Sequence, residues 1–138
     1  MSVRTFVDSN VLIYAYDSQA EFKQAVAKNL LHDLWETRDG VLSVQVLQEF
    51  YVNVTRKIPV PLSKSIARQI VEDFVSWCVD TTSAEILAAF SIEDRYLVSF
   101  WDALILAVAA KSGAHRVVSE DLNPGQVIAG MQIENPFA

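Results

Sequence analysis

Four acidic residues lie in apolar stretches of the sequence, where a charged side chain is costly unless something stabilises it. Asp8 stands between Phe-Val and Ser-Asn-Val-Leu-Ile, and Glu49 stands in the segment Val-Leu-Gln-Glu-Phe-Tyr-Val. Asp102 is the only charged residue of Leu-Val-Ser-Phe-Trp-Asp-Ala-Leu-Ile-Leu, and Asp121 follows Arg-Val-Val-Ser-Glu. Carboxylate oxygens are preferred ligands of Mg²⁺ and Mn²⁺, so these side chains would form a metal site if the fold brought them together.

The elements that would position these acids alternate along the chain. Short β-forming segments are separated by helical patterns of ten or more residues, which indicates a mostly parallel sheet of about five strands with helices on both faces. We expect strands at residues 3–8, 41–44, 78–80 and 116–119 and an edge strand at residues 133–137. Capping-box patterns at Ser18–Glu21 and Thr82–Glu85, together with Ser63 and Ser99, predict helix starts.

The strand ends indicate where the acids should meet. Parallel strands bring their C-terminal ends to one edge of the sheet, and ligands collect at that edge. Asp8 ends the first predicted strand and Asp121 follows the fourth, so both are expected there. Asp102 lies in the first turn of its helix and reaches the same edge if that helix follows the usual crossover geometry.

Each acid also has a purely structural explanation. Asp102 follows Ser99 at the spacing of a helix capping box, and Asp121 could belong to a turn or a helix cap. Glu49 lies opposite the apolar face of its helix, as a solvated residue would. Asp8 could close an Asx-type turn with the two residues that follow it. Only the joint occurrence of the four acids favours a site.

Composition excludes several classes of protein. The chain has 138 residues with 11 Lys and Arg against 17 Asp and Glu, and the net charge of −6 argues against a broad basic surface that coats nucleic acid. Glycine-rich phosphate-binding loops and a serine nucleophile elbow are missing from the sequence, and the two histidines are far apart. The one cysteine, Cys78, excludes a disulfide framework and a multi-cysteine metal site.

The same properties indicate how the chain is organised. We expect residues 1–138 to form one domain, because the length suits one core and neither linker nor repeat interrupts the sequence. We also expect a cytoplasmic protein without membrane association. The longest apolar run is too short to span a bilayer, and the first residues lack the pattern of an export signal.

The order of the acidic motifs resembles that of a known family. The segments FVDSNVLIYA, QEF, WDALI and SEDL resemble those of the PIN-domain ribonucleases, and in particular the compact VapC-type toxins of bacterial and archaeal toxin–antitoxin pairs. The resemblance extends over essentially the whole chain. It implies a three-layer α/β/α sandwich, endoribonuclease activity that depends on Mg²⁺ or Mn²⁺, a homodimer, and an antitoxin encoded alongside.

The resemblance also implies roles for individual residues. The positions that match the metal-binding acids of the family are Asp8, Glu49, Asp102 and Asp121. Asn10 matches a residue that supports the site, Ser119 matches the Ser or Thr before the last acid, and Ser9 could add a hydrogen bond beside Asp8.

The expected reaction is hydrolysis of an RNA phosphodiester bond by a metal-activated water. Such a reaction leaves 5′-phosphate and 3′-hydroxyl ends. Either Glu49 or Asp121 would orient the water, and one or two ions would be bound. Two alternatives stay open, namely a PIN-type nuclease of RNA maturation or quality control and a noncatalytic interaction module.

Overall fold

The computed structural model describes residues 3–138 and contains, in that range, one sheet of six strands in the order β3-β2-β1-β4-β6-β5. The strands are β1 (Thr5–Val7), β2 (Gly40–Ser43), β3 (Cys78–Val79), β4 (Arg116–Val118), β5 (Val127–Ile128) and β6 (Met131–Glu134). All neighbouring pairs are parallel except β5 and β6, which are antiparallel. The predicted mostly parallel sheet is therefore confirmed, with one strand more than expected.

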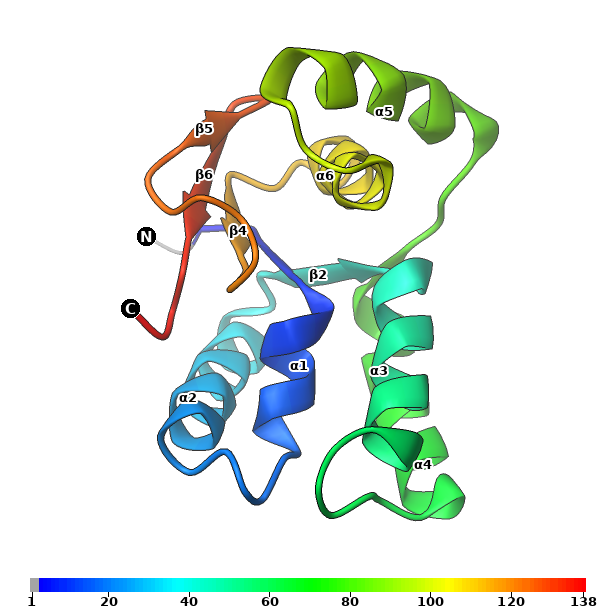
Figure 1. Cartoon of the computed structure of the whole chain (residues 1–138), viewed down its shortest axis with the longest axis vertical. Coiled ribbons are helices and arrows are strands. Elements are labelled where there is room, and N and C mark those ends of the chain that lie inside the picture. Colours follow the sequence, from blue (N-terminus) through cyan, green and yellow to red (C-terminus); the bar gives the residue numbers. More distant parts are fainter. Residues whose placement is uncertain (1–2) are drawn as a thin grey trace.

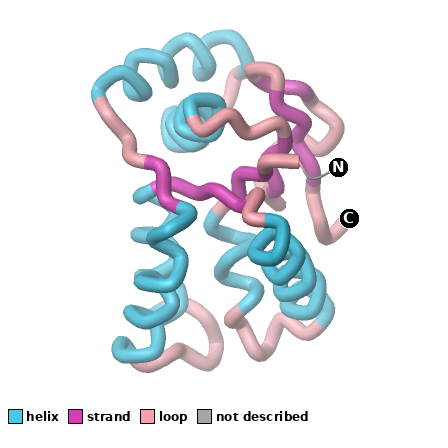
Figure 2. The backbone as a smooth tube through the Cα atoms, turned by 180° about the vertical axis from the view of Figure 1, so that it is seen from behind, coloured by secondary structure: helices cyan, strands magenta, loops and turns pink. Residues whose placement is uncertain are grey.

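Helices cover both faces of the sheet, which confirms the predicted three-layer arrangement (Figure 1). The helices are α1 (Ser9–Ala15), α2 (Phe22–Thr37), α3 (Val44–Arg56), α4 (Lys64–Phe74), α5 (Ser83–Tyr96) and α6 (Phe100–Lys111). In Figure 1 and, from behind, in Figure 2, α5 and α6 lie on one side of the sheet and α1 to α4 on the other. Among residues 3–138 no helix is both long enough and apolar enough to cross a membrane.

The C-terminal strand corrects one prediction. The strand expected at residues 133–137 is β6, and it does not form the edge of the sheet, because β5 pairs with it on its outer side. The register Ile128↔Met131 shows a tight hairpin, and Gly130 in its turn has a φ of +81°, which favours glycine. A strand of two residues is too short to show an alternating pattern, so the sequence did not predict it.

Serine caps explain where several helices begin. Ser43, Ser63 and Ser99 each precede a helix and accept a hydrogen bond from the backbone N–H three residues later. The Thr82–Glu85 capping box is present as predicted. The predicted helix start at the Ser18–Glu21 capping box is wrong, because α2 begins only after Glu21. The φ of Glu21 is +36°, and its side chain makes no capping hydrogen bond.

Helix α1 follows β1 without an intervening loop and is the element that the sequence analysis did not assign. Asp8 is its N-cap and accepts a hydrogen bond from the N–H of Ser9. The helix is held by burial of Val11, Leu12 and Ala15 in the main core. The strand-to-helix turn therefore places Asp8 at the C-terminal edge of the sheet, between β1 and α1.

Candidate active site

Asp8 is the most buried of the four acids, with 5% of its surface exposed. Its Oδ1 accepts a hydrogen bond from the Ser9 N–H at 2.7 Å, and its Oδ2 accepts one from the Ser119 hydroxyl at 2.7 Å. Burial raises the pKa of Asp8 from 3.8 to about 6, although these two hydrogen bonds oppose the change. The charges of Glu49 and Asp102 raise it further, so these acids lie within electrostatic reach of Asp8.

Asn10 connects the end of β1 with the end of β4. Its Nδ2 donates to Asp121 Oδ2 at 3.1 Å and, at 3.4 Å, to Asp8 Oδ2 and to Ser119 Oγ. Ser119 Oγ in turn accepts from the Asp121 N–H at 3.1 Å. Asp8 and Asp121 therefore lie at the same edge of the sheet, held by one amide and one hydroxyl.

Glu49 and Asp102 approach this edge from α3 and α6. Burial is the main reason that the pKa of each carboxyl is raised. The negative charge of Asp121 raises both values further, and that of Asp102 also raises the pKa of Glu49, while Gln45 and Ser99 respectively lower them. The four acids thus form one electrostatic cluster, with Asp121 as its exposed member.

Glu49 corrects the interpretation of a solvated helix residue. The side chain is half-buried, and its Oε1 is fully buried without a hydrogen-bond partner among residues 3–138. A buried acceptor without a donor costs free energy unless a cation or water satisfies it. Glu49 therefore lies where a ligand is needed, although the helical pattern alone places it on the polar face of α3.

The capping explanation for Asp102 is correct only in part. Its backbone N–H donates to the Ser99 hydroxyl at 3.1 Å, which starts α6. Within the described residues its carboxylate accepts no hydrogen bond from the Ser99 N–H, so no reciprocal capping box is formed. The Asp102 carboxylate is free for another partner.

The chemistry of the four acids fits a hard divalent cation. In residues 3–138 none of the four is in an ion pair with Lys, Arg or His. Uncompensated carboxylates at one edge repel one another, and a divalent cation would turn that repulsion into attraction. The described residues hold no ready-made cage of three closely spaced ligands. Mg²⁺ accommodates such an open set, because it keeps several waters and needs only one or two carboxylates.

A second cluster beside the site escaped the sequence analysis. Glu120 Oε2 pairs with Lys23 Nζ at 2.5 Å, and Glu120 Oε1 accepts a hydrogen bond from the Tyr14 hydroxyl at 2.8 Å. The Glu120 N–H donates to Asn10 Oδ1 at 3.1 Å. We call Tyr14, Lys23 and Glu120 the Glu120 clamp. It ties the loop that carries Asp121 to α1 and α2, and its only signal in the sequence is that Glu120 adjoins Asp121.

Comparison with solved structures shows the same fold in toxin–antitoxin proteins. A toxin–antitoxin complex from Klebsiella pneumoniae matches with a TM-score of 0.72 and 16% identity over 96% of this chain and 97% of that one. DNA-bound VapBC from Salmonella typhimurium matches with a TM-score of 0.68 and 19% identity over 98% and 99%. The sarcin–ricin-loop-cleaving VapC toxin of Mycobacterium tuberculosis matches with a TM-score of 0.60 and 19% identity, over 82% of this chain and 86% of that one.

The sequence itself matches one family model. No curated protein matches the chain. The model of the PIN domain matches residues 5–127, a range that runs from β1 into β5 and includes all four acids. The resemblance seen in the acidic motifs is confirmed, and the chain belongs to the PIN domain family.

Proposed function

We propose that this PIN-domain protein is a divalent-metal-dependent endoribonuclease and the toxin of a VapBC-type toxin–antitoxin pair. The observation that carries the proposal is the group of four carboxylates at the C-terminal edge, none of them paired with a basic side chain in the described part of the chain. Membership of the PIN family and the likeness to toxin–antitoxin structures support the same function.

In the proposed site Asp8 and Asp102 are the principal metal ligands, and Asp121 and Glu49 complete the shell directly or through water. Bound Mg²⁺ or Mn²⁺ would lower the pKa of a water and offset the charge that develops on the phosphate. Ser9 and Ser119 hold the two oxygens of Asp8 in place. Asn10 orients Asp121 in the same way.

Glu49 is the residue that we assign to the attacking water. Its carboxyl is half-buried beside the other acids, and burial raises its pKa, which makes it a stronger base. A hydrogen bond from the water to the Glu49 carboxylate would orient its oxygen towards phosphorus, and transfer of that proton to the carboxylate would leave a hydroxide as the nucleophile. Attack by water leaves a 5′-phosphate on one product and a 3′-hydroxyl on the other.

Two surfaces suit the partners of such a toxin. An apolar groove of about 600 Å³ lies between α3 and α4, with Leu47, Tyr51 and Val71 among its lining residues. An apolar antitoxin helix would fit this groove next to the helix that carries Glu49. On the other side of the sheet, Leu87 of α5 and Trp101 of α6 are 66% and 63% exposed, and we assign this face to the homodimer.

The decisive experiment combines metal binding with cleavage. We expect titration calorimetry with Mn²⁺ to show stoichiometric binding that Asp8→Asn weakens, and we expect the wild type to cut RNA in Mg²⁺ but not in EDTA. Sequencing of the product ends tests water as the nucleophile. Stoichiometric binding without RNA cleavage would contradict the nuclease, and growth arrest relieved by a co-expressed antitoxin would separate a toxin from an RNA-maturation nuclease.

A further inference from the structure

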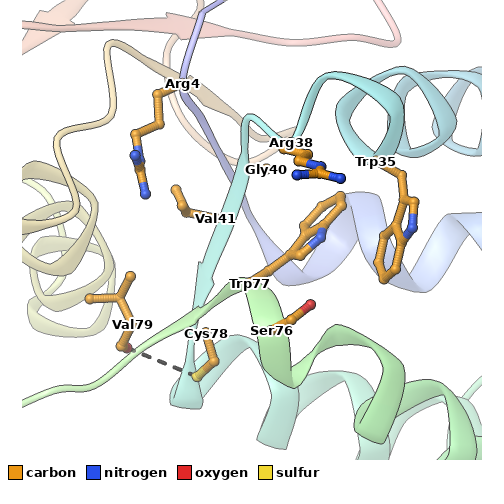
Figure 3. A pocket seen from close by; sticks show the side chains of 9 residues that line it. All are labelled: Arg4, Trp35, Arg38, Gly40, Val41, Ser76, Trp77, Cys78 and Val79. Atoms are coloured by element: carbon orange, nitrogen blue, oxygen red, sulfur yellow. Dashed lines mark hydrogen bonds between the residues drawn. The ribbon is translucent and has the colours of Figure 1, made fainter.

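A pocket of about 440 Å³ lies at the opposite edge of the sheet, where β1 and β2 begin. Its lining includes Arg4, just before β1, Arg38, just after α2, and the indoles of Trp35 and Trp77. Figure 3 shows the two arginines towards one end of this pocket and Ser76 and Cys78 towards the other. We call it the amino-edge pocket. None of its lining residues belongs to the acidic cluster.

The side chains of the two arginines in this pocket have no polar partner among residues 3–138. Neither side chain makes a hydrogen bond or an ion pair there, whereas Lys23, Lys111 and Arg116 are each paired with a glutamate. Each arginine presents a planar fork of donors that suits phosphate oxygens. Two such groups in one pocket are notable in a chain with a net charge of −6.

The aromatic wall of the pocket is closely packed on its inner side. Trp77 is 8% exposed, and its ring lies so close to Gly40 that a Cβ there would be 2.4 Å from the ring. The Trp35 ring packs on Trp77 with their centroids 5.2 Å apart, yet Trp35 is 46% exposed. Trp35 therefore offers an exposed indole surface for stacking, and the two arginines of the same pocket offer phosphate binding. Proteins hold single-stranded nucleic acid by this combination of aromatic and basic side chains.

We propose that the amino-edge pocket binds a nucleotide unit, with phosphate at Arg4 and Arg38 and a base on the exposed surface of Trp35. The inference rests on the proposed function for the source of that unit, a strand of the RNA substrate outside the catalytic edge. Arg4 and Asp8 are four residues of extended chain apart, about 13 Å, but β1 between them is fully buried, so an RNA strand that contacts both edges has to pass over the surface of the molecule. An acidic protein that must hold RNA needs such a local site, because its surface as a whole repels the phosphates.

The test compares two double variants that remove the same charge. Arg4→Ala with Arg38→Ala removes the pocket cations, and Lys57→Ala with Lys64→Ala removes two exposed lysines that have no partner among residues 3–138. Binding of a single-stranded RNA oligonucleotide is followed in EDTA, where no cleavage occurs, by tryptophan fluorescence. We expect the arginine variant to bind about tenfold more weakly and to lower the salt slope of log K by about 1.4, the value for two phosphate contacts to a single strand.

Other ligands distinguish the source of the nucleotide. Binding of a mononucleotide such as uridine monophosphate at similar affinity would identify a free nucleotide as the ligand, whereas binding of the oligonucleotide alone would identify the RNA strand. Equal weakening of RNA binding in both double variants would overturn the proposal. Equal quenching of the tryptophan fluorescence by polyglutamate and by RNA would overturn it as well. Circular dichroism establishes that both variants are folded.

Cleavage assays separate this inference from the proposed function. In Mg²⁺ the arginine variant should show a raised KM on a long RNA and an unchanged kcat on a dinucleotide. An unchanged KM on the long RNA would refute the pocket and leave the nuclease intact. RNA binding at the pocket by a wild type that never cleaves would refute the nuclease and leave the pocket intact.

Discussion

The two edges of the central sheet contrast in charge and in the packing of their side chains. At the C-terminal edge four carboxylates share one region, and Asp8 among them is buried without a basic partner in the described residues. At the N-terminal edge Arg4 and Arg38 stand beside Trp77, which packs directly on Gly40. The first edge stores electrostatic repulsion, and the second is closely packed.

This difference follows from what each edge has to do. The acidic edge carries negative charge without a basic partner in the described residues, and in the proposed function a cation completes it, so its free energy would depend on pH and on metal. The amino-terminal edge is held by the packing of Trp77 on Gly40, and its two arginines are exposed and free to bind a ligand. In the proposed function the acidic edge is therefore less stable because it is built to bind a cation, whereas the amino-terminal edge adds to the stability of the fold.

The largest expected effect is the loss of cleavage on removing a central acid. Asp8→Asn keeps the shape of the side chain and an acceptor for the Ser9 N–H but removes the charge, and we expect RNA cleavage in Mg²⁺ to fall by at least about 100-fold. Asp94→Asn, at an exposed position of α5, is the matched control and should cleave as the wild type does. Equal rates in the wild type and Asp8→Asn would remove the functional contrast between the edges.

The next effect concerns stability in the absence of metal. Because the pKa of Asp8 is about 6 in the folded protein and 3.8 ordinarily, the folded state retains a proton that the unfolded state has lost between these values. The free energy of unfolding should therefore fall as pH rises from 4 to 6, by about 3 kcal/mol at most. Denaturant melts in EDTA test this, and Asp8→Asn should lose this component of the slope. Identical slopes in the two proteins would show that burial does not raise this pKa.

A third effect tests the packed edge. Gly40→Ala would place a Cβ within 2.4 to 2.6 Å of three Trp77 ring atoms, and we expect a loss of about 1–3 kcal/mol in the free energy of unfolding. The loss should shrink in a Trp77→Leu background, as a double-mutant cycle would measure. The kcat for a dinucleotide per folded molecule should not change, and a change would mean that the packing at this edge affects the acidic site.

The smallest effect concerns the Glu120 clamp. Glu120→Gln removes the charge that pairs with Lys23 and loosens the loop that carries Asp121. We expect Mn²⁺ affinity to fall about tenfold, as for other residues that orient metal ligands. Glu134→Gln, which removes the partner of Arg116 outside the site, is the control for a lost surface ion pair. Equal affinities in all three proteins would show that the clamp does not position Asp121.

Much of the sheet could be predicted, because most of its strands have local signals. The β-forming runs at β1, β2 and β4 and the serine caps of α4 and α6 are short-range features that the sequence displays directly. Strand β5 and the position of β6 within the sheet depend on a hairpin whose two-residue strand has no periodicity. Helix α1 was missed because its seven residues are too few to display a helical period, although Asp8 is a typical N-cap residue.

The site was predictable to a similar degree. The rule that parallel strands end at one edge places Asp8 and Asp121 together, and Asn10 bonds to both of them. The burial of Glu49 was not predictable, because helical periodicity describes one helix and cannot show what lies against its polar face. The pairing of Glu120 with Lys23 joins residues 97 positions apart and depends on tertiary structure alone.

The shortness of β1, three residues long, makes salt concentration a variable of this molecule. Arg4 and Asp8, which flank its two ends and carry opposite charges, are about 13 Å apart along the backbone, and this exceeds the screening distance of about 8 Å at physiological ionic strength. At about 0.01 M salt the screening length is about 30 Å, so the charges of the arginines and of the carboxylates would interact. Titrations of the acids in dilute buffer would then include the effect of the arginines at the opposite edge, whereas titrations at the ionic strength of a cell would report the acidic edge alone.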